Sequence, residues 1–105
     1  MNCKHDFIFF EKADEKEIKK EKEKARSLKK KQWWKNKLAS GICHYCGRNV
    51  GRENLTMDHV VPLIRGGKST KGNIVAACKE CNSKKKYMTP VEWEEYIQKL
   101  KGEDG

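Results

Sequence analysis

Two cysteine pairs constrain this chain more than any other feature. Cys43-x-x-Cys46 and Cys78-x-x-Cys81 are separated by 31 residues. Two C-x-x-C turns in a basic chain without a secretory signal predict one tetrahedral four-cysteine zinc site, in preference to disulfides or to four free cysteines. A redox C-x-x-C motif would not explain two pairs. The gap is longer than in a simple zinc ribbon, so we expect further structure to be built inside it.

The size of the chain explains why a metal staple is needed. The chain has 105 residues, and the first forty or so are too polar to contribute to a core. About sixty residues remain for the compact part, and a core of that size usually needs a metal or another cross-link. We therefore expect an N-terminal arm and charged helix over 1–41, and a compact domain over 42–105 that depends on zinc for folding.

The segment between the cysteine pairs predicts two short strands. Leu55–Val61 is rich in β-formers and ends before Pro62, and 73–77 is a second apolar run. A glycine-containing basic loop, 65–69, lies between them, and a helix over 78–87 follows. The predicted fold class is α+β: a small module of strand, loop, strand and helix, whose two ends are clamped by a zinc ion on four cysteines.

Helices are predicted on both sides of this module. A long charged helix over 11–38 carries Glu–Lys pairs at helical spacing and ends at Gly41. Its basic second half either follows a phosphate backbone or is a solvated face, and for Trp33 and Trp34 we favour packing on the core. A short amphipathic helix over 89–101 begins with a capping box of Thr89 and Glu92, and its apolar face predicts a core contact. That face contains Val91, Trp93, Tyr96, Ile97 and Leu100.

The N-terminal arm, 1–10, offers two readings. Cys3 and His5 could be a metal ligand pair. We favour the alternative, in which the aromatic cluster 7–10 covers part of the core or a partner, because a metal site needs more ligands.

The charge of the chain indicates its partners. The formal net charge is +9 and the isoelectric point is about 9.4, which suit a polyanion such as nucleic acid or an anionic membrane. The sequence shows no apolar run near 18 residues and no signal peptide, so we expect no membrane span. We expect a cytoplasmic protein, bacterial or phage-encoded. Aromatic RNP motifs, which would indicate RNA binding, do not occur.

Four residues between and after the cysteine pairs can support hydrolysis of a phosphodiester. Asp58 and Asn82 offer oxygens that suit a hard divalent ion, and His59 can act as a base near neutral pH. Taken alone, an Asp-His pair is more often a pair of polar surface residues than a site. Asn73 alone is more often a turn residue, and Asn82 alone is more often a residue at a helix end. Side chains alternate along a regular strand, so Asp58 and His59 should point to opposite faces. Either the pleat is broken near Pro62, or the helical ligand approaches from the side.

The order of these motifs resembles the HNH endonucleases over about 42–93. The resemblance rests on the two C-x-x-C pairs, Asp58-His59-Val60-Val61-Pro62-Leu63, Gly66-Gly67, Gly72-Asn73-Ile74 and Asn82-x-Lys84-Lys85. It implies a ββα-metal fold that nicks or cuts DNA. His59 would be the general base, Asp58 a ligand of the catalytic metal, and Asn73 the residue that orients the loop or His59. Asn82 stands where many members have His and would be the second metal ligand, which makes an H-N-N variant.

Three expectations follow from this resemblance. An amide oxygen in place of an imidazole favours Mg²⁺ or Mn²⁺ over Zn²⁺ at the catalytic site. Basic side chains near the motif are expected to contact DNA phosphates, although they could equally be a solvated run; they are Arg65, Lys68, Lys84, Lys85 and Lys86. With no recognisable sequence-reading element, we expect weak specificity, or a homodimer or other protein partner that supplies it. The alternative function is a zinc-stapled DNA-binding module without catalysis.

Overall fold

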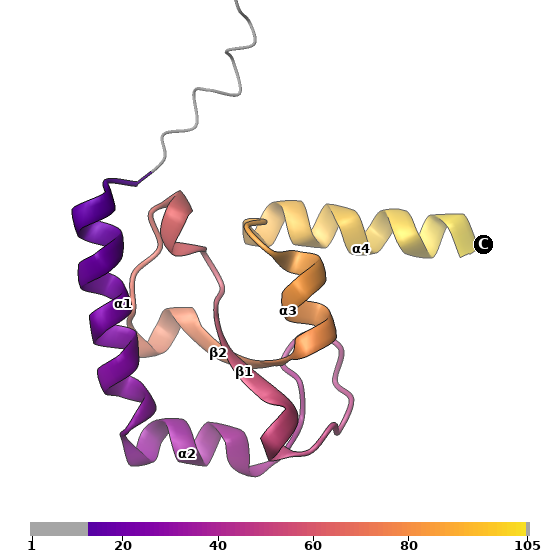
Figure 1. The fold of residues 1–105 in the computed structure, drawn as a ribbon. Helices are drawn as coiled ribbons and strands as arrows, with labels where there is room; N and C mark the ends of the chain where they lie inside the picture. The colour runs from indigo at the N-terminus through magenta and orange to yellow at the C-terminus, as the bar shows by residue number, and fades with distance from the viewer. Residues whose placement is uncertain (1–12, 105) are drawn as a thin grey trace, which may run out of the picture.

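A two-stranded antiparallel hairpin forms the centre of the computed structural model, which describes residues 13–104 (Figure 1). Strand β1 (Leu55–His59) pairs with β2 (Ile74–Cys78), with Leu55 opposite Cys78 and His59 opposite Ile74. Every residue of β2 is buried. The predicted α+β class is confirmed, with strands that each end or begin one or two residues from the expected positions. The expectations for Cys3, His5 and the cluster 7–10 lie outside the described residues.

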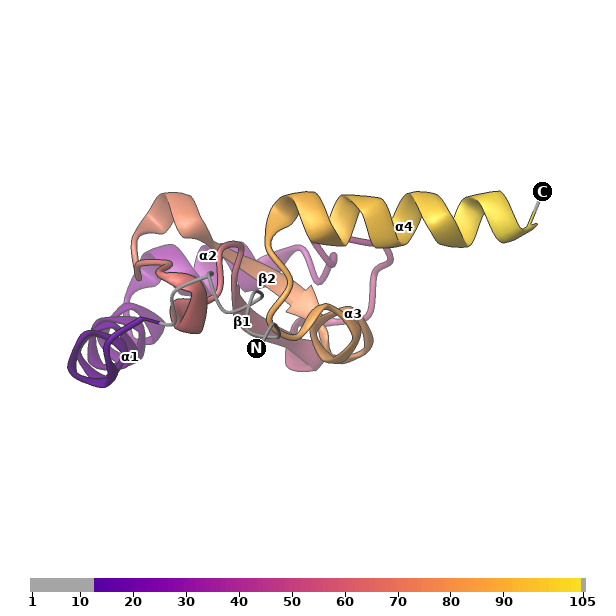
Figure 2. The same cartoon turned by 90° about the horizontal axis from the view of Figure 1, so that it is seen from above.

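Helices lie on both sides of the hairpin. Helix α3 (Lys79–Lys85) follows β2 directly, and α1 (Glu15–Lys29) lies on the opposite side of the hairpin, as both views show (Figures 1 and 2). Helix α2 (Gln32–Ala39) runs across the molecule between α1 and the loop that follows α2. Gly41 follows α2 with φ 72°, the left-handed conformation expected there.

The single long helix predicted over 11–38 is wrong: the structure has two helices, broken at Lys30 and Lys31. Lys31 is extended, with φ −88° and ψ 154°. No proline or glycine forces this break. Instead, α1 buries Glu21 against the loop after β1, while α2 buries Trp34 in the core. A straight helix could not serve both contacts, so tertiary packing overrides local helix propensity.

The core is small and contains three of the cysteines. Trp34, Leu55 and Ile74 are its large apolar members, and Trp33 packs against it, so the expected core role of the tryptophans is confirmed. Trp34 comes from the part of the chain before residue 42 and belongs to this core. The expected division at residue 42 stays a prediction.

Helix α4 (Pro90–Asp104) was expected to form core, and this is wrong. Val91 is 67% exposed and Leu100 is 39% exposed. Lys86 has a positive φ of 43°, and the chain turns there so that α4 extends away from the hairpin (Figure 1). The predicted capping box is confirmed, because the Thr89 N–H donates to Glu92 Oε1 at 3.0 Å and the Glu92 N–H donates to Thr89 Oγ1 at 3.4 Å. No helix in the described range is both long and apolar enough to cross a membrane.

Candidate active site and zinc centre

The four cysteines of the two C-x-x-C pairs converge as predicted. Their sulfur atoms all lie within 4.8 Å of one another, and Cys46 Sγ is 3.9 Å from Cys78 Sγ. Four sulfurs at about 2.3 Å from a tetrahedral zinc would be about 3.8 Å apart. Backbone N–H groups of Cys46 and Cys81 donate to the sulfurs of Cys43 and Cys78, as in a zinc knuckle. The donor set and its spacing fit a structural zinc held by four thiolates.

Arg48 supports this cluster from its exposed edge. Its Nε donates to Cys46 Sγ at 3.3 Å, and its Nη2 forms an ion pair with Glu80 at 2.6 Å. The hydrogen bond from Arg48 lowers the pKa of the Cys46 thiol to about 6, whereas burial raises the pKa of Cys81. A thiolate is the form that binds metal, so Arg48 favours the ligand state at the most exposed cysteine.

Asp58 points from β1 toward α3 and is buried. The Tyr45 hydroxyl donates to Asp58 Oδ2 at 2.6 Å, and Lys85 Nζ lies 3.3 Å from the same oxygen. Burial, and then the neighbouring carboxylate, raise the pKa of Tyr45, so the phenol stays protonated and remains a donor. Tyr45 lies inside the zinc knuckle, and nothing in the sequence pattern singled it out.

Lys85 does not fit its expected place on a DNA-facing surface. Its side chain is 1% exposed, and its ammonium also donates to the His59 carbonyl at 3.2 Å. The helix α3 turns this lysine inward toward Asp58, because Lys85 lies three residues after Asn82, on the face that covers β1. Its charge therefore balances the buried carboxylate.

Asn82 lies on the same side of β1 as Asp58. Its Nδ2 donates to Thr56 Oγ1 at 2.9 Å, and Thr56 is two residues before Asp58 on the strand. Within the described part of the chain, Oδ1 of Asn82 and Oδ1 of Asp58 accept no hydrogen bond. One carboxylate oxygen and one amide oxygen on the same face suit a hard divalent ion completed by water.

His59 points to the other side, toward α1. Its Nε2 lies 2.9 Å from Ser69 Oγ, and the ring is half buried. Burial lowers the pKa of His59, against the opposing effect of the Asp58 and Glu21 carboxylates. The imidazole is therefore favoured in its neutral form, which is the form that can accept a proton.

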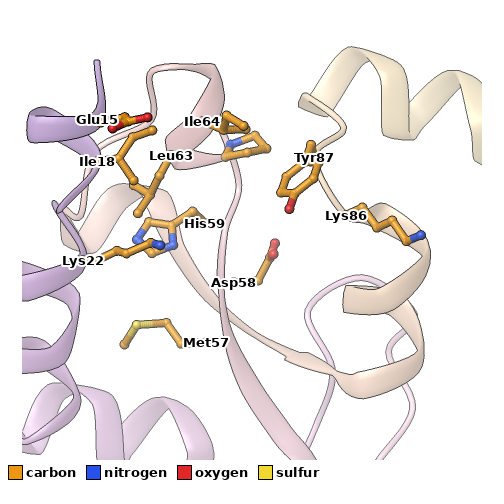
Figure 3. Close-up of a pocket in the computed structure, with 11 residues that line it drawn as sticks. Glu15, Ile18, Lys22, Met57, Asp58, His59, Leu63, Ile64, Lys86 and Tyr87 are labelled. Atoms are coloured by element: carbon orange, nitrogen blue, oxygen red, sulfur yellow. The ribbon is translucent and has the colours of Figure 1, made fainter. Parts of the chain in front are cut away.

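Asp58 and His59 nevertheless border one hollow of about 360 Å³ at the end of β1 (Figure 3). Lys86 and Tyr87 line it on the Asp58 side, and Lys22 of α1 lines it on the His59 side. The alternation of the strand is thus kept through both residues, and α3 approaches from the Asp58 side. Neighbouring strand residues that point to opposite sides can therefore border one hollow.

Asn73 holds the loop that follows β1. Its Oδ1 accepts from the Val61 N–H at 2.9 Å, and its Nδ2 donates to the carbonyls of Val61 and Lys68. Gly67 closes the same loop, and a Cβ there would lie 1.7 Å from the Val61 carbonyl oxygen. Of the two roles that the resemblance implies for Asn73, these hydrogen bonds correspond to holding the loop.

The remaining basic residues divide by position. Arg65 forms a bidentate pair with Glu92 at 3.0 and 3.1 Å, which ties the loop to α4. Lys84 pairs with Glu80 on the side away from His59, and Lys68 pairs with Glu17 of α1. A second hollow borders His59, and three cationic side chains of α1 line it: Lys22, Arg26 and Lys29. Lys22 was not among the basic residues that the sequence singled out.

Comparisons with known proteins match the segment that carries these residues. The family described as HNH endonuclease matches residues 43–96. The chain is 39% identical over 49 residues to a CRISPR-associated endonuclease Cas9 of Actinomyces naeslundii and 43% identical over 44 residues to that of Corynebacterium diphtheriae. It is 37% identical over 60 residues to the type IV methyl-directed restriction enzyme EcoKMcrA of Escherichia coli.

These similarities cover 46%, 41% and 51% of this chain, in that order. They cover 4% of each Cas9 and 22% of the restriction enzyme, so the chain corresponds to a small part of each relative. The family match spans half of the chain and includes both cysteine pairs, Asp58, His59, Asn73 and Asn82. This chain belongs to the HNH endonuclease family.

Proposed function

We propose that this chain is a metal-dependent DNA endonuclease that hydrolyses phosphodiester bonds. His59 is the general base, and Asp58 and Asn82 hold a divalent metal. The observation that carries the proposal is the hollow in which a buried carboxylate and a half-buried neutral imidazole meet between two lysines, Lys22 and Lys86.

The reaction assigns a separate task to each side chain. His59 takes a proton from the attacking water at a ring nitrogen, and burial supports this role by keeping the ring neutral. Tyr45 and Lys85 hold the Asp58 carboxylate in one orientation by contacting the same oxygen, which leaves the other oxygen available. When bound, a divalent cation stabilises negative charge on the phosphate and on the leaving oxygen.

The donor set supports Mg²⁺ or Mn²⁺ in this role. Asp58 and Asn82 offer oxygen atoms, which these hard ions prefer, whereas zinc prefers sulfur and imidazole ligands, such as the thiolates that the cysteine cluster supplies. If Zn²⁺ supports nicking as well as Mg²⁺ does, this preference is wrong.

We propose that DNA lies across the end of β1, between α1 and α3. Exposed cations border this path on both sides, and they would contact phosphates without reading bases: Lys22, Arg26, Lys29, Lys68 and Lys86. Lys84 faces the other side, and Arg65 is engaged with Glu92, so both are less suited to the path. The names of the relatives, an endonuclease and a restriction enzyme, agree with DNA as the substrate.

One active site nicks one strand, so a double-strand cut would need a second copy or a second nick. A homodimer or another protein partner, and a cytoplasmic location, stay predictions.

The test is a supercoiled-plasmid assay with the full chain, loaded with structural zinc, in a series of Mg²⁺, Mn²⁺ and Zn²⁺. We expect conversion to open circles with Mg²⁺ or Mn²⁺, and a loss of about 10²–10⁴-fold in rate for His59→Ala. His44→Ala is the matched control, because His44 is an exposed histidine on the zinc knuckle.

Plasmid that is shifted in a gel but never nicked, with zinc content and fold intact, would support the alternative of a DNA-binding module without catalysis. Equal nicking by His59→Ala and the unchanged chain would remove His59 as the base.

A further inference from the structure

Helix α1, together with the residue that precedes its N-cap, contacts the loop after β1 at three successive points. The Ala13 N–H donates to the Ile64 carbonyl at 3.0 Å, Glu17 pairs with Lys68 at 3.6 Å, and Glu21 accepts from the Ser69 N–H at 2.6 Å. The last two come from residues four apart, on one face of the helix. The family match begins at residue 43, so this helix lies outside it.

Ser69 is held by Glu21 through two hydrogen bonds. Its N–H donates to Glu21 Oε1 at 2.6 Å, and its hydroxyl donates to the Glu21 carbonyl at 2.6 Å. Both residues are buried, with Glu21 3% and Ser69 6% exposed, and Lys24 balances the other carboxylate oxygen at 3.2 Å. A buried carboxylate on an otherwise solvated helix needs such partners, so this contact is specific.

The direction of these hydrogen bonds determines which ring nitrogen of His59 carries the hydrogen. A serine hydroxyl has one hydrogen, and Ser69 gives it to the Glu21 carbonyl, which can only accept. Ser69 Oγ must then accept from its other partner, the His59 ring, so Nε2 carries the hydrogen. In a neutral imidazole, the unprotonated nitrogen is then Nδ1.

We infer that α1 is a working part of the active centre: Glu21 fixes Ser69 as an acceptor, and Ser69 fixes His59 as the Nε2–H tautomer, with Nδ1 as the nitrogen that takes the proton from water. Glu21 and Ser69 are positioning residues, because both act through His59. The role of Nδ1 rests on the proposed function, whereas the tautomer is a property of the protein without substrate.

The first test is NMR of the imidazole nitrogens in the full, zinc-loaded chain, at a pH where the ring is neutral. We expect long-range ¹H–¹⁵N correlations of the Nε2–H form for the unchanged chain and for Ser69→Thr, which keeps the hydroxyl. Ser69→Ala should show a mixture of tautomers. An Nδ1–H pattern in the unchanged chain, or an unaltered pattern in Ser69→Ala, overturns the inference.

The second test is single-strand nicking by the same variants. We expect Ser69→Ala to lower kcat by about 10- to 100-fold, a part of the roughly 10²–10⁴-fold contribution of a general base. The KM for DNA should stay within about twofold, because Ser69 is buried and cannot contact phosphate. Ser83→Ala is the matched control, since Ser83 is exposed on α3. Unchanged kcat in Ser69→Ala overturns the inference.

Glu21 variants separate the hydrogen bond from the charge. Both variants keep the main-chain carbonyl that accepts from the Ser69 hydroxyl. Glu21→Gln also keeps an acceptor oxygen for the Ser69 N–H and should retain the tautomer, whereas Glu21→Ala removes that acceptor, loosens Ser69 and should weaken the tautomer preference. Zinc content and thermal melting show whether each variant folds, and Ser69→Ala decides the case if Glu21→Ala does not.

The proposed function of His59 and the positioning role of α1 can be contradicted separately. If His59→Ala nicks plasmid as fast as the unchanged chain, the proposed function fails, and the tautomer measurement still stands alone. If His59 is required for nicking but Ser69→Ala alters neither tautomer nor kcat, only the inference about α1 fails.

Discussion

The two faces of β1 are built in different ways. On the Asp58 face, the partners Tyr45, Asn82 and Lys85 all lie within the family-matched segment, beside the cysteine cluster. On the His59 face, Ser69 is held by Glu21, which belongs to a helix outside that segment. The half of the site that we propose to bind the catalytic metal is therefore self-contained, whereas the half that carries the proposed base depends on α1.

The physical forces on the two faces differ as well. The Asp58 face holds a buried ion pair, in which each charge is stable only while the other is present. The His59 face holds a chain of hydrogen bonds that sets direction and tautomer. Disturbing the first face should mainly change stability and metal affinity, and disturbing the second should mainly change kcat.

Removing the structural zinc should break both faces together, and this is the largest effect that we expect. Structural zinc contributes about 10–16 kcal/mol in zinc-finger peptides, and this core is small. Cys81→Ser, or chelation of the unchanged chain, should abolish the folded circular-dichroism signal and all nicking. If amide exchange shows that the hairpin persists in the metal-free chain, the two faces of β1 do not depend on the structural zinc.

Asp58→Ala should destabilise the chain by about 3–5 kcal/mol, because it leaves the buried Lys85 ammonium without its carboxylate. The double variant Asp58→Ala, Lys85→Met should recover much of this loss, although neither variant binds the catalytic metal. Urea unfolding with zinc retained measures both. If the double variant is no more stable than the single one, the ion pair does not govern this face.

Tyr45→Phe should test whether the Asp58 face can be weakened without a change on the His59 face. Loss of a hydrogen bond to a carboxylate costs about 1.5–3 kcal/mol, and here it also loosens Asp58. Calorimetry with Mn²⁺ should show weaker binding at the catalytic site in Tyr45→Phe and unchanged binding in Ser69→Ala. Equal weakening in both variants would mean that the two faces are not independent.

Acid should act on the His59 face through Glu21, with the smallest effect of the series. The hydrogen bond from the Ser69 N–H lowers the pKa of the Glu21 carboxyl below its value in the unfolded chain. Its contribution to stability is thus present above the unfolded pKa and is lost as the pH falls through the folded pKa. Unfolding measured between about pH 5 and 3 should be less pH-dependent in Glu21→Gln than in the unchanged chain. An identical pH dependence would contradict this.

The cysteine cluster was predictable from sequence, because it depends on local spacing. Two C-x-x-C turns specify a four-thiolate cluster wherever the chain brings them together, and Asp58-His59 and Asn82 follow from the same ordered motif. The capping box of Thr89 and Glu92 was predictable for the same reason, since its partners are three residues apart.

The features that the sequence did not predict share one cause, which is contact between residues far apart in the chain. Lys85 reads as one of three exposed lysines, yet its burial depends on Asp58, 27 positions earlier. Glu21 reads as one acid of an ordinary Glu–Lys helical pair, and that pair does form with Lys24. Its contact with Ser69, across a separation of 48, leaves no periodic signal.

The sequence by itself determined the four-cysteine cluster, the α+β class, the family and the residues of the motif, because cysteine spacing and strand or helix periodicity are properties of neighbouring residues. Only the tertiary structure decided the break between α1 and α2, the exposure of α4 and the division of the site between two faces of β1. These features depend on which buried partner each segment meets, and a buried charge or hydroxyl takes its role from a partner far away in the chain.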